Sequence, residues 1–165
     1  MILLTGPGVL AKVVEDDHYK FRADFPGVVS DKAEDFGAKG APLTWRLYTS
    51  SSPASQTDAS YTAAIKVFDT DTTDVRQLFA AGENDAVQSL GVPLLGRKDG
   101  TFGADKLPSV TLSFQSGMDG TAGALKGRVL LVVKGNRLYE VTFSSRGSDQ
   151  TAVETKFFQS FEILP

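Results

Sequence analysis

The sequence predicts an α+β fold in which an antiparallel sheet of about six or seven strands carries two packed helices, as a layered sandwich. Two observations lead to this fold class. Several segments alternate apolar and polar residues with period two, the pattern of strands with one face in a core and the other in water. Two other segments repeat their apolar residues at helical spacing. Consecutive strands joined by short turns favour antiparallel pairing.

The length and composition fit one domain over residues 1–165. A chain of 165 residues is expected to bury about 70% of the surface that its unfolded form exposes. Hydrophobic residues make up 41% and charged residues 22%, which excludes disordered, collagen-like and coiled-coil chains. No run of about 18 apolar residues occurs, so we expect a soluble globular protein without an integral membrane segment.

Two further counts limit the chemistry and the partners. The formal net charge is −3, which argues against nucleic acid as a partner. Cysteine is absent, which excludes disulfides, thiolate metal sites and cysteine nucleophiles.

The opening residues 1–8 lack the basic segment that begins a signal peptide. We expect a periplasmic or other extracytoplasmic location for a domain whose signal was removed, and keep the cytoplasm as the alternative.

Strands are expected in the first half of the chain at residues 9–14, 18–25, 44–48 and 60–67. In the second of these, Tyr19, Phe21 and Phe25 lie on one side and polar residues on the other. An acidic turn at residues 15–17 separates the first two strands. A loop over residues 49–60, rich in serine and threonine, joins the last two.

A helix is expected over residues 74–90, where apolar residues recur at helical spacing. Thr73 or Asp74 can cap its start, and the Gly-Val-Pro that follows marks its end. Gly82 inside it costs about 1 kcal/mol relative to alanine. After the helix, residues 91–108 are rich in glycine and proline and are expected to form a long surface loop or a small excursion.

The C-terminal part combines strands with a second helix. Strands are expected at residues 109–115, 129–133 and 138–144. Residues 129–133 are apolar at every position, which is typical of a central strand covered on both faces. Gly135-Asn136 suits a type II′ hairpin turn into the next strand. A helix from about residue 149 to 161 follows, with Ser148 or Asp149 as its cap.

Three segments carry a resemblance to a known family. They are the aromatic strand Tyr19-Lys-Phe21…Phe25-Pro26, the hairpin from Gly127 through Gly135-Asn136 to Tyr139, and the closing helix Phe157-Phe158-Gln-Ser160-Phe161. Together with the element order, they resemble the PsbP-like fold group. That group includes the extrinsic PsbP subunit of the oxygen-evolving photosystem, a Ran-binding nuclear import factor and bacterial lipoproteins.

The resemblance implies the same α+β fold and a non-catalytic protein that works by binding another macromolecule. It does not say which macromolecule. No manganese, chloride or photosystem-docking signature carries over to this sequence. The lipoprotein role lacks support, because the chain has no cysteine for a lipid anchor.

The residues that could carry chemistry have simpler structural roles. His18 is the sole histidine and lies on the polar side of its strand, so we expect it to face solvent. The acidic residues 69–74 lack the glycine and glutamate of a calcium loop and are expected to end a strand and cap a helix. Ser116 and Ser148 lack the nucleophile-elbow pattern, and the glycine-rich residues 117–127 lack the ending of a phosphate loop. We therefore assign no catalytic residue, metal ligand or cofactor, and expect no enzyme.

Charge is uneven along the chain and indicates a contact surface. Residues 58–105 hold eight acidic and four basic residues, whereas residues 121–147 hold five basic residues and one acidic residue. We place the partner surface at Lys126, Arg128 and Arg137. The leading hypothesis is a non-catalytic binding or adaptor domain with a protein partner, itself a monomer or weak dimer. The alternatives are a small-molecule carrier or enzyme with a pocket between sheet and helix, and a structural domain of a larger assembly.

Overall fold

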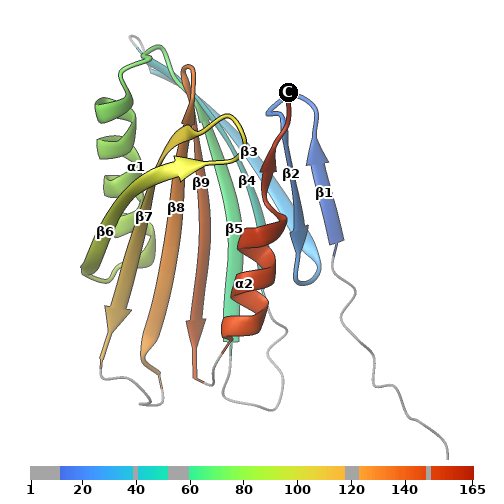
Figure 1. The fold of residues 1–165 in the computed structure, drawn as a ribbon, viewed down its shortest axis with the longest axis vertical. Helices are drawn as coiled ribbons and strands as arrows, with labels where there is room; N and C mark the ends of the chain where they lie inside the picture. Colours follow the sequence, from blue (N-terminus) through green and yellow to red (C-terminus); the bar gives the residue numbers. More distant parts are fainter. Residues whose placement is uncertain (1–11, 39–40, 52–59, 118–122, 148–149) are drawn as a thin grey trace, which may run out of the picture.

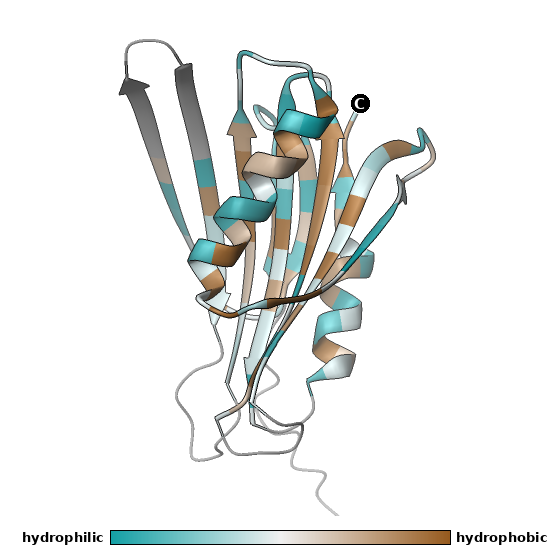
Figure 2. Ribbon diagram, turned by 90° about the vertical axis from the view of Figure 1, so that its left-hand side faces the viewer, coloured by the Kyte–Doolittle hydropathy of each residue, from teal (hydrophilic) through white to brown (hydrophobic). Residues whose placement is uncertain are grey.

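The computed structural model describes residues 12–38, 41–51, 60–117, 123–147 and 150–165. Within this part lie ten strands and two helices, and the α+β class is confirmed (Figure 1). A large sheet forms the middle layer. The helix α1 (Val75–Leu90) covers one face, and the helix α2 (Thr151–Ser160) lies with a small sheet on the other. Figure 2 shows α1 in front of the large sheet and α2 behind it.

The two sheets are antiparallel throughout the described residues. The large sheet has the order β3-β4-β5-β9-β8-β7-β6. In that order its strands are Val29–Ala38, Ala41–Ser51, Ser60–Asp69, Arg137–Arg146, Leu125–Lys134, Leu107–Ser116 and Leu94–Phe102. The small sheet has the order β1-β2-β10, with strands Lys12–Asp16, Phe21–Phe25 and Glu162–Ile163. The strand β10, which follows α2, therefore pairs with β2, so the last strand of the described chain lies beside one of its first strands.

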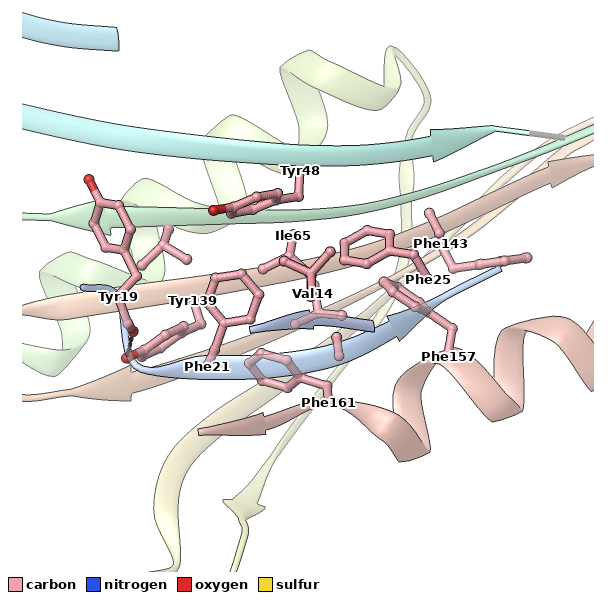
Figure 3. Packing of buried hydrophobic residues seen from close by; sticks show 14 of the residues in the cluster. Val14, Tyr19, Phe21, Phe25, Tyr48, Ile65, Tyr139, Phe143, Phe157 and Phe161 are labelled. Atoms are coloured by element: carbon pink, nitrogen blue, oxygen red, sulfur yellow. Dashed lines mark hydrogen bonds between the residues drawn. The ribbon is translucent and has the colours of Figure 1, made fainter. Parts of the chain in front are cut away.

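Two hydrophobic clusters hold the layers together. The first joins the large sheet to the small sheet and α2, and in it Phe25 and Phe157 approach each other with ring centroids 5.2 Å apart (Figure 3). The second lies under α1 and includes Leu131 and Leu138. The strand β8 supplies Val132 to the first cluster and Val129, Leu131 and Val133 to the second. The prediction of a central strand covered on both faces is thus confirmed.

The local signals of α1 and of the β8–β9 turn act as predicted. The Asp74 side chain caps α1 by accepting from the backbone N–H groups of Arg76 and Gln77. A Cβ atom at Gly82 would meet Leu131 and Leu138 side-chain carbons at 3.0 Å, so glycine lets α1 lie close to the sheet. Gly135 has a φ of 65°, which the tight turn requires.

Two stretches correct the sequence prediction. Residues 91–108 are not a surface loop, because β6 and the start of β7 form a hairpin there. The strand β6 lies at the sheet edge and most of its side chains are exposed, so its sequence shows no alternation. The other edge strand, β3, was also not predicted, and residues 44–48 are part of the longer β4.

The N-terminal boundaries also differ. The strand β1 continues through Asp16, where a turn was expected, and β2 begins only at Phe21. The Asp16 carboxylate holds the intervening turn by accepting from the backbone N–H groups of His18 and Tyr19, both at 2.9 Å. The expected caps of α2, Ser148 and Asp149, lie outside the described residues.

Within the described residues, neither helix has the length and apolar character needed to cross a bilayer.

Candidate functional site

Four cationic side chains share one face of the β8–β9 hairpin. Register pairs Arg128 with Phe143 and Lys134 with Arg137, and directly paired residues project on the same side of a sheet. Alternate residues of a strand also share a face. The face toward α2 therefore carries Lys126, Arg128, Lys134 and Arg137. The hairpin's acidic residue, Glu140, projects to the opposite face, beneath α1.

The structure separates these cations into two pairs. Lys126 and Arg128 lie near the open end of the hairpin, and Lys134 and Arg137 flank its turn. Arg137 is six residues along β9 from the partner of Arg128, a distance of about 20 Å at the rise of a strand. The three residues assigned to a partner surface thus lie at two places, with Lys126 and Arg128 together and Arg137 apart. Their role in binding a partner stays a prediction.

Arg128 lies between the sheet and α2. Its Nε is 2.7 Å from Glu154 Oε1, and its guanidinium carbon lies 4.6 Å from the centre of the Phe158 ring. The side chain nevertheless keeps 41% of its surface exposed. An ion pair on one side and a ring below hold the guanidinium in one orientation, so its outer edge can accept a further anion with little loss of entropy.

A cavity of about 330 Å³ adjoins this guanidinium. We call it the Arg128 groove; it is lined by Thr111, Arg128, Leu130, Thr155, Phe158 and Gln159. The hydroxyl and amide groups can donate and accept hydrogen bonds, and the leucine and phenylalanine provide an apolar floor. This combination can hold a carboxylate on an apolar stem, such as an acidic side chain.

The other pair of cations lines a second cavity, also of about 330 Å³, at the hairpin turn. We call it the hairpin-end cavity; it is lined by Lys20, Lys134, Asn136, Arg137, Tyr139 and Pro165. Burial is the largest influence on Arg137 and acts to lower the pKa of its guanidinium. The hydrogen bond to Asp69, with Nε 2.6 Å from Oδ1, and the interactions with Tyr139 together outweigh burial and raise that pKa. Arg137 also donates to the backbone oxygen of His18 at 3.1 Å.

A third cavity, of about 440 Å³, lies on the other side of α2. Its lining is mostly apolar and comprises Asp24, Pro26, Tyr61, Ala152, Val153, Lys156 and Phe157. Tyr61 donates to the backbone oxygen of Pro26 at 3.0 Å, and burial raises the pKa of its phenol. This is a pocket between sheet and helix, at the kind of place that the small-molecule hypothesis requires.

A buried ionic cluster, which the sequence pattern did not predict, lies beneath α1. Lys66 on β5 donates to both oxygens of Asp85 on α1, at 3.0 and 2.9 Å. Glu140 lies opposite Lys66 on β9 and is 4% exposed. Burial, with the Asp85 carboxylate nearby, raises the pKa of Glu140 to about 8. Alternation alone places Glu140 on a solvated face, and only the packing of α1 shows that this face is covered.

A second buried acid has a structural role. Asp16 accepts from Tyr48 Oη at 2.6 Å in addition to the two backbone N–H groups of its turn. Burial acts to raise the pKa of Asp16, but these hydrogen bonds and the Arg46 charge outweigh it and lower the pKa. The carboxylate therefore fastens the small sheet to β4 of the large sheet.

His18 lies in the turn before β2 and not on a strand as predicted, but it faces solvent as expected. His18 keeps 72% of its side chain exposed, with Nε2 3.9 Å from Asp69 Oδ2, so its solvent-facing position is confirmed. Asp74 is the cap of α1, as predicted. Across the described ranges, no group of three or more histidine, cysteine, aspartate or glutamate residues is placed to hold a metal ion.

The fold and these cavities define an α+β domain with two cationic pockets at opposite ends of one hairpin. No family model and no curated protein matches the chain. Among solved structures, it is similar to a protein from Bacteroides thetaiotaomicron, with a TM-score of 0.48 and 16% identity over 95% of this chain and 50% of that one. The chain thus spans half the length of that protein.

Two further similar structures are those of cyanobacterial PsbP and of LpqN. Cyanobacterial PsbP from Synechocystis has a TM-score of 0.43 and 13% identity, covering 96% of this chain and 95% of that one. LpqN, described as involved in cell envelope biogenesis of Mycobacterium tuberculosis, has a TM-score of 0.43 and 12% identity, covering 83% and 92%. The similar structures thus include PsbP, the namesake of the fold group that the sequence resembles. These identities bear on the fold alone, so the function has to rest on the chain's own residues.

Proposed function

We propose that this chain is a non-catalytic binding domain that holds an acidic segment of a protein partner in the Arg128 groove. The observation that carries the proposal is the half-exposed Arg128 side chain, held by Glu154 and Phe158 at the rim of a cavity. Lys126 lies two residues away on the same face and is exposed. The two cations supply electrostatic attraction, which speeds the encounter with an acidic partner and orients it.

The chemistry of the lining supports binding rather than catalysis. The two hydroxyls of the groove belong to Thr111 and Thr155, and they share it with a guanidinium and an amide. Activation of a hydroxyl as a nucleophile needs an adjacent base, and the residues lining the groove include none. The arrangement instead offers a charge-assisted contact, neutral hydrogen-bonding groups and an apolar floor, which together favour a carboxylate.

The expected result of a charge reversal tests this surface. Affinity capture from a native lysate at two salt concentrations should yield a partner whose binding weakens at the higher salt. Lys126→Glu should weaken that binding about tenfold or more, which corresponds to roughly 1.4 kcal/mol. Arg128→Gln should weaken it as well, without creating the repulsion from Glu154 that a glutamate would cause.

Arg76→Glu is the matched control, because Arg76 is exposed on α1, on the opposite side of the large sheet. It changes the net charge by the same amount as Lys126→Glu. If all three variants bound the partner equally tightly, the Arg128 groove would not be part of the contact surface.

A second function has an observation of its own. The cavity beside Tyr61 is larger, mostly apolar and carries two charged groups, Asp24 and Lys156, at a place where sheet and helix meet. These are the features of a small-molecule site. A small molecule that co-purifies with the chain, together with no captured protein at either salt concentration, would favour this carrier function over the proposed one.

A further inference from the structure

We propose that the hairpin-end cavity is an anion site that binds the phosphate group of a phosphorylated molecule. The site is distinct from the proposed partner surface, since Arg137 lies about 20 Å from Arg128 along the hairpin. Its lining also differs from that of the Arg128 groove. Three cations and polar groups surround its space of about 330 Å³, whereas the groove has one cation and an apolar floor.

The cations converge on the cavity from separate parts of the chain. Lys20 comes from the turn between β1 and β2, Lys134 from the end of β8, and Arg137 from the start of β9. Figure 1 shows that the β1–β2 turn, the β8–β9 turn and the end of the chain lie at the same end of the molecule. A site assembled from distant segments needs the tertiary fold, whereas a run of solvated lysines does not.

Three of the six residues that line the cavity are cations. The Asp69 carboxylate is bound by one of them, Arg137, and lies 3.9 Å from His18. A phosphate group carries about 1.5 to 2 negative charges at neutral pH and three acceptor oxygens, so it can contact several cations at once. Ammonium and guanidinium groups are also the usual partners of phosphate oxygens.

The lining is held in place before any ligand binds. Lys134 Nζ donates to the backbone oxygen of Leu164 at 2.9 Å, and the guanidinium of Arg137 is fixed by Asp69 and the Tyr19 ring. Tyr139 Oη donates to the backbone oxygen of Tyr19 at 2.7 Å, the dashed contact in Figure 3. Groups fixed in this way lose little entropy when an anion arrives.

The position of Lys20 is fixed by its backbone. Its φ is 55°, in the left-handed region where glycine or asparagine is favoured and another residue costs on the order of 1 kcal/mol, and Lys106 in the β6–β7 turn has a similar φ of 50°. The backbone of Lys20 is held there by the hydrogen bond from Leu164 N to Lys20 O, at 2.8 Å.

Titration of the isotope-labelled chain with inorganic phosphate tests the site. The backbone amides of Lys20, Asn136 and Arg137 should shift saturably in nuclear magnetic resonance spectra, with a dissociation constant on the order of 1 mM. The double variant Lys20→Gln/Lys134→Gln should bind at least about tenfold more weakly. Lys98→Gln removes an exposed cation of β6 that lines none of the cavities described above, and should leave the binding unchanged.

The spectra of the variants also report whether they fold. Shifts no larger than those produced by chloride at equal ionic strength, or shifts that persist in the folded double variant, would overturn the site. Vesicles of phosphatidylcholine with and without phosphatidic acid identify the source of the phosphate group. If the site is supported, capture by phosphatidic acid that depends on Lys20 and Lys134 assigns a lipid headgroup, and failure of capture assigns a soluble phosphorylated molecule.

Discussion

Replacing Phe157 with alanine is expected to lower the free energy of unfolding by about 3–5 kcal/mol. The Phe157 side chain is 1% exposed and contacts rings from both sheets, with centroid distances of 5.2 Å to Phe25 and 6.4 Å to Phe143. Truncation removes the apolar contact that fastens α2 to both sheets and leaves a cavity in the first cluster (Figure 3). Urea unfolding followed by circular dichroism measures the loss.

An exposed apolar residue provides the control for this substitution. Val28 keeps 87% of its surface exposed, so Val28→Ala should change the free energy of unfolding by no more than about 0.5 kcal/mol. A loss below about 1 kcal/mol for Phe157→Ala would show that α2 is not fixed to the sheets as described. The Arg128 groove would then lack one of its walls.

The stability of the chain is expected to fall by about 3 kcal/mol between pH 6 and pH 9 because of Glu140. A glutamate has an ordinary pKa of 4.5, whereas burial raises the pKa of Glu140 to about 8. The folded state therefore binds this proton more tightly than the unfolded state does. The resulting stabilisation is complete below pH 4.5 and is lost as the pH rises to 8 and beyond.

Glu140→Gln isolates this effect, because glutamine keeps the size of the side chain and cannot ionise. The variant should match the pH dependence of the original chain below pH 4.5 and lack its later loss, so that the difference in stability between the two grows in favour of the variant by roughly 3 kcal/mol between pH 6 and pH 9. Lys66 and Asp85 are unchanged in both proteins, so the difference between the two unfolding curves belongs to position 140. Parallel pH profiles for the two chains would contradict a neutral Glu140 in the folded state.

Much of the fold could be predicted, because strands with one buried face show that fact in their own residues. Residues of β2 alternate between core and surface, and residues 129–133 of β8 are apolar because a hydrophobic cluster lies on each face of the strand. The α1 boundaries were predictable because Asp74 and Gly91 act locally, within one turn of the helix. These signals depend on near neighbours in the sequence.

The rest depends on contacts that a linear pattern does not contain. The edge strands β3 and β6 each pair with one other strand. Most side chains of β6 are exposed, so burial does not impose an alternating pattern on its residues. Charge counting indicated Lys126, Arg128 and Arg137 but could not place them along the hairpin. Arg128 lines one cavity, with Lys126 two residues away on the same face, and Arg137 lines the other cavity. Lys20 joins the second cavity from more than a hundred residues away, and its positive φ is a property of the folded turn.

The most direct test of the proposed function is photo-crosslinking from inside the Arg128 groove. A photoreactive phenylalanine analogue at Thr155, which is exposed and lines the groove, should crosslink to the captured partner. The same analogue at Gln88, exposed on α1 on the opposite side of the large sheet, should not. A crosslink at position 155 alone is the predicted result. A crosslink at position 88 alone, or none at either position with a partner that binds, would contradict the account.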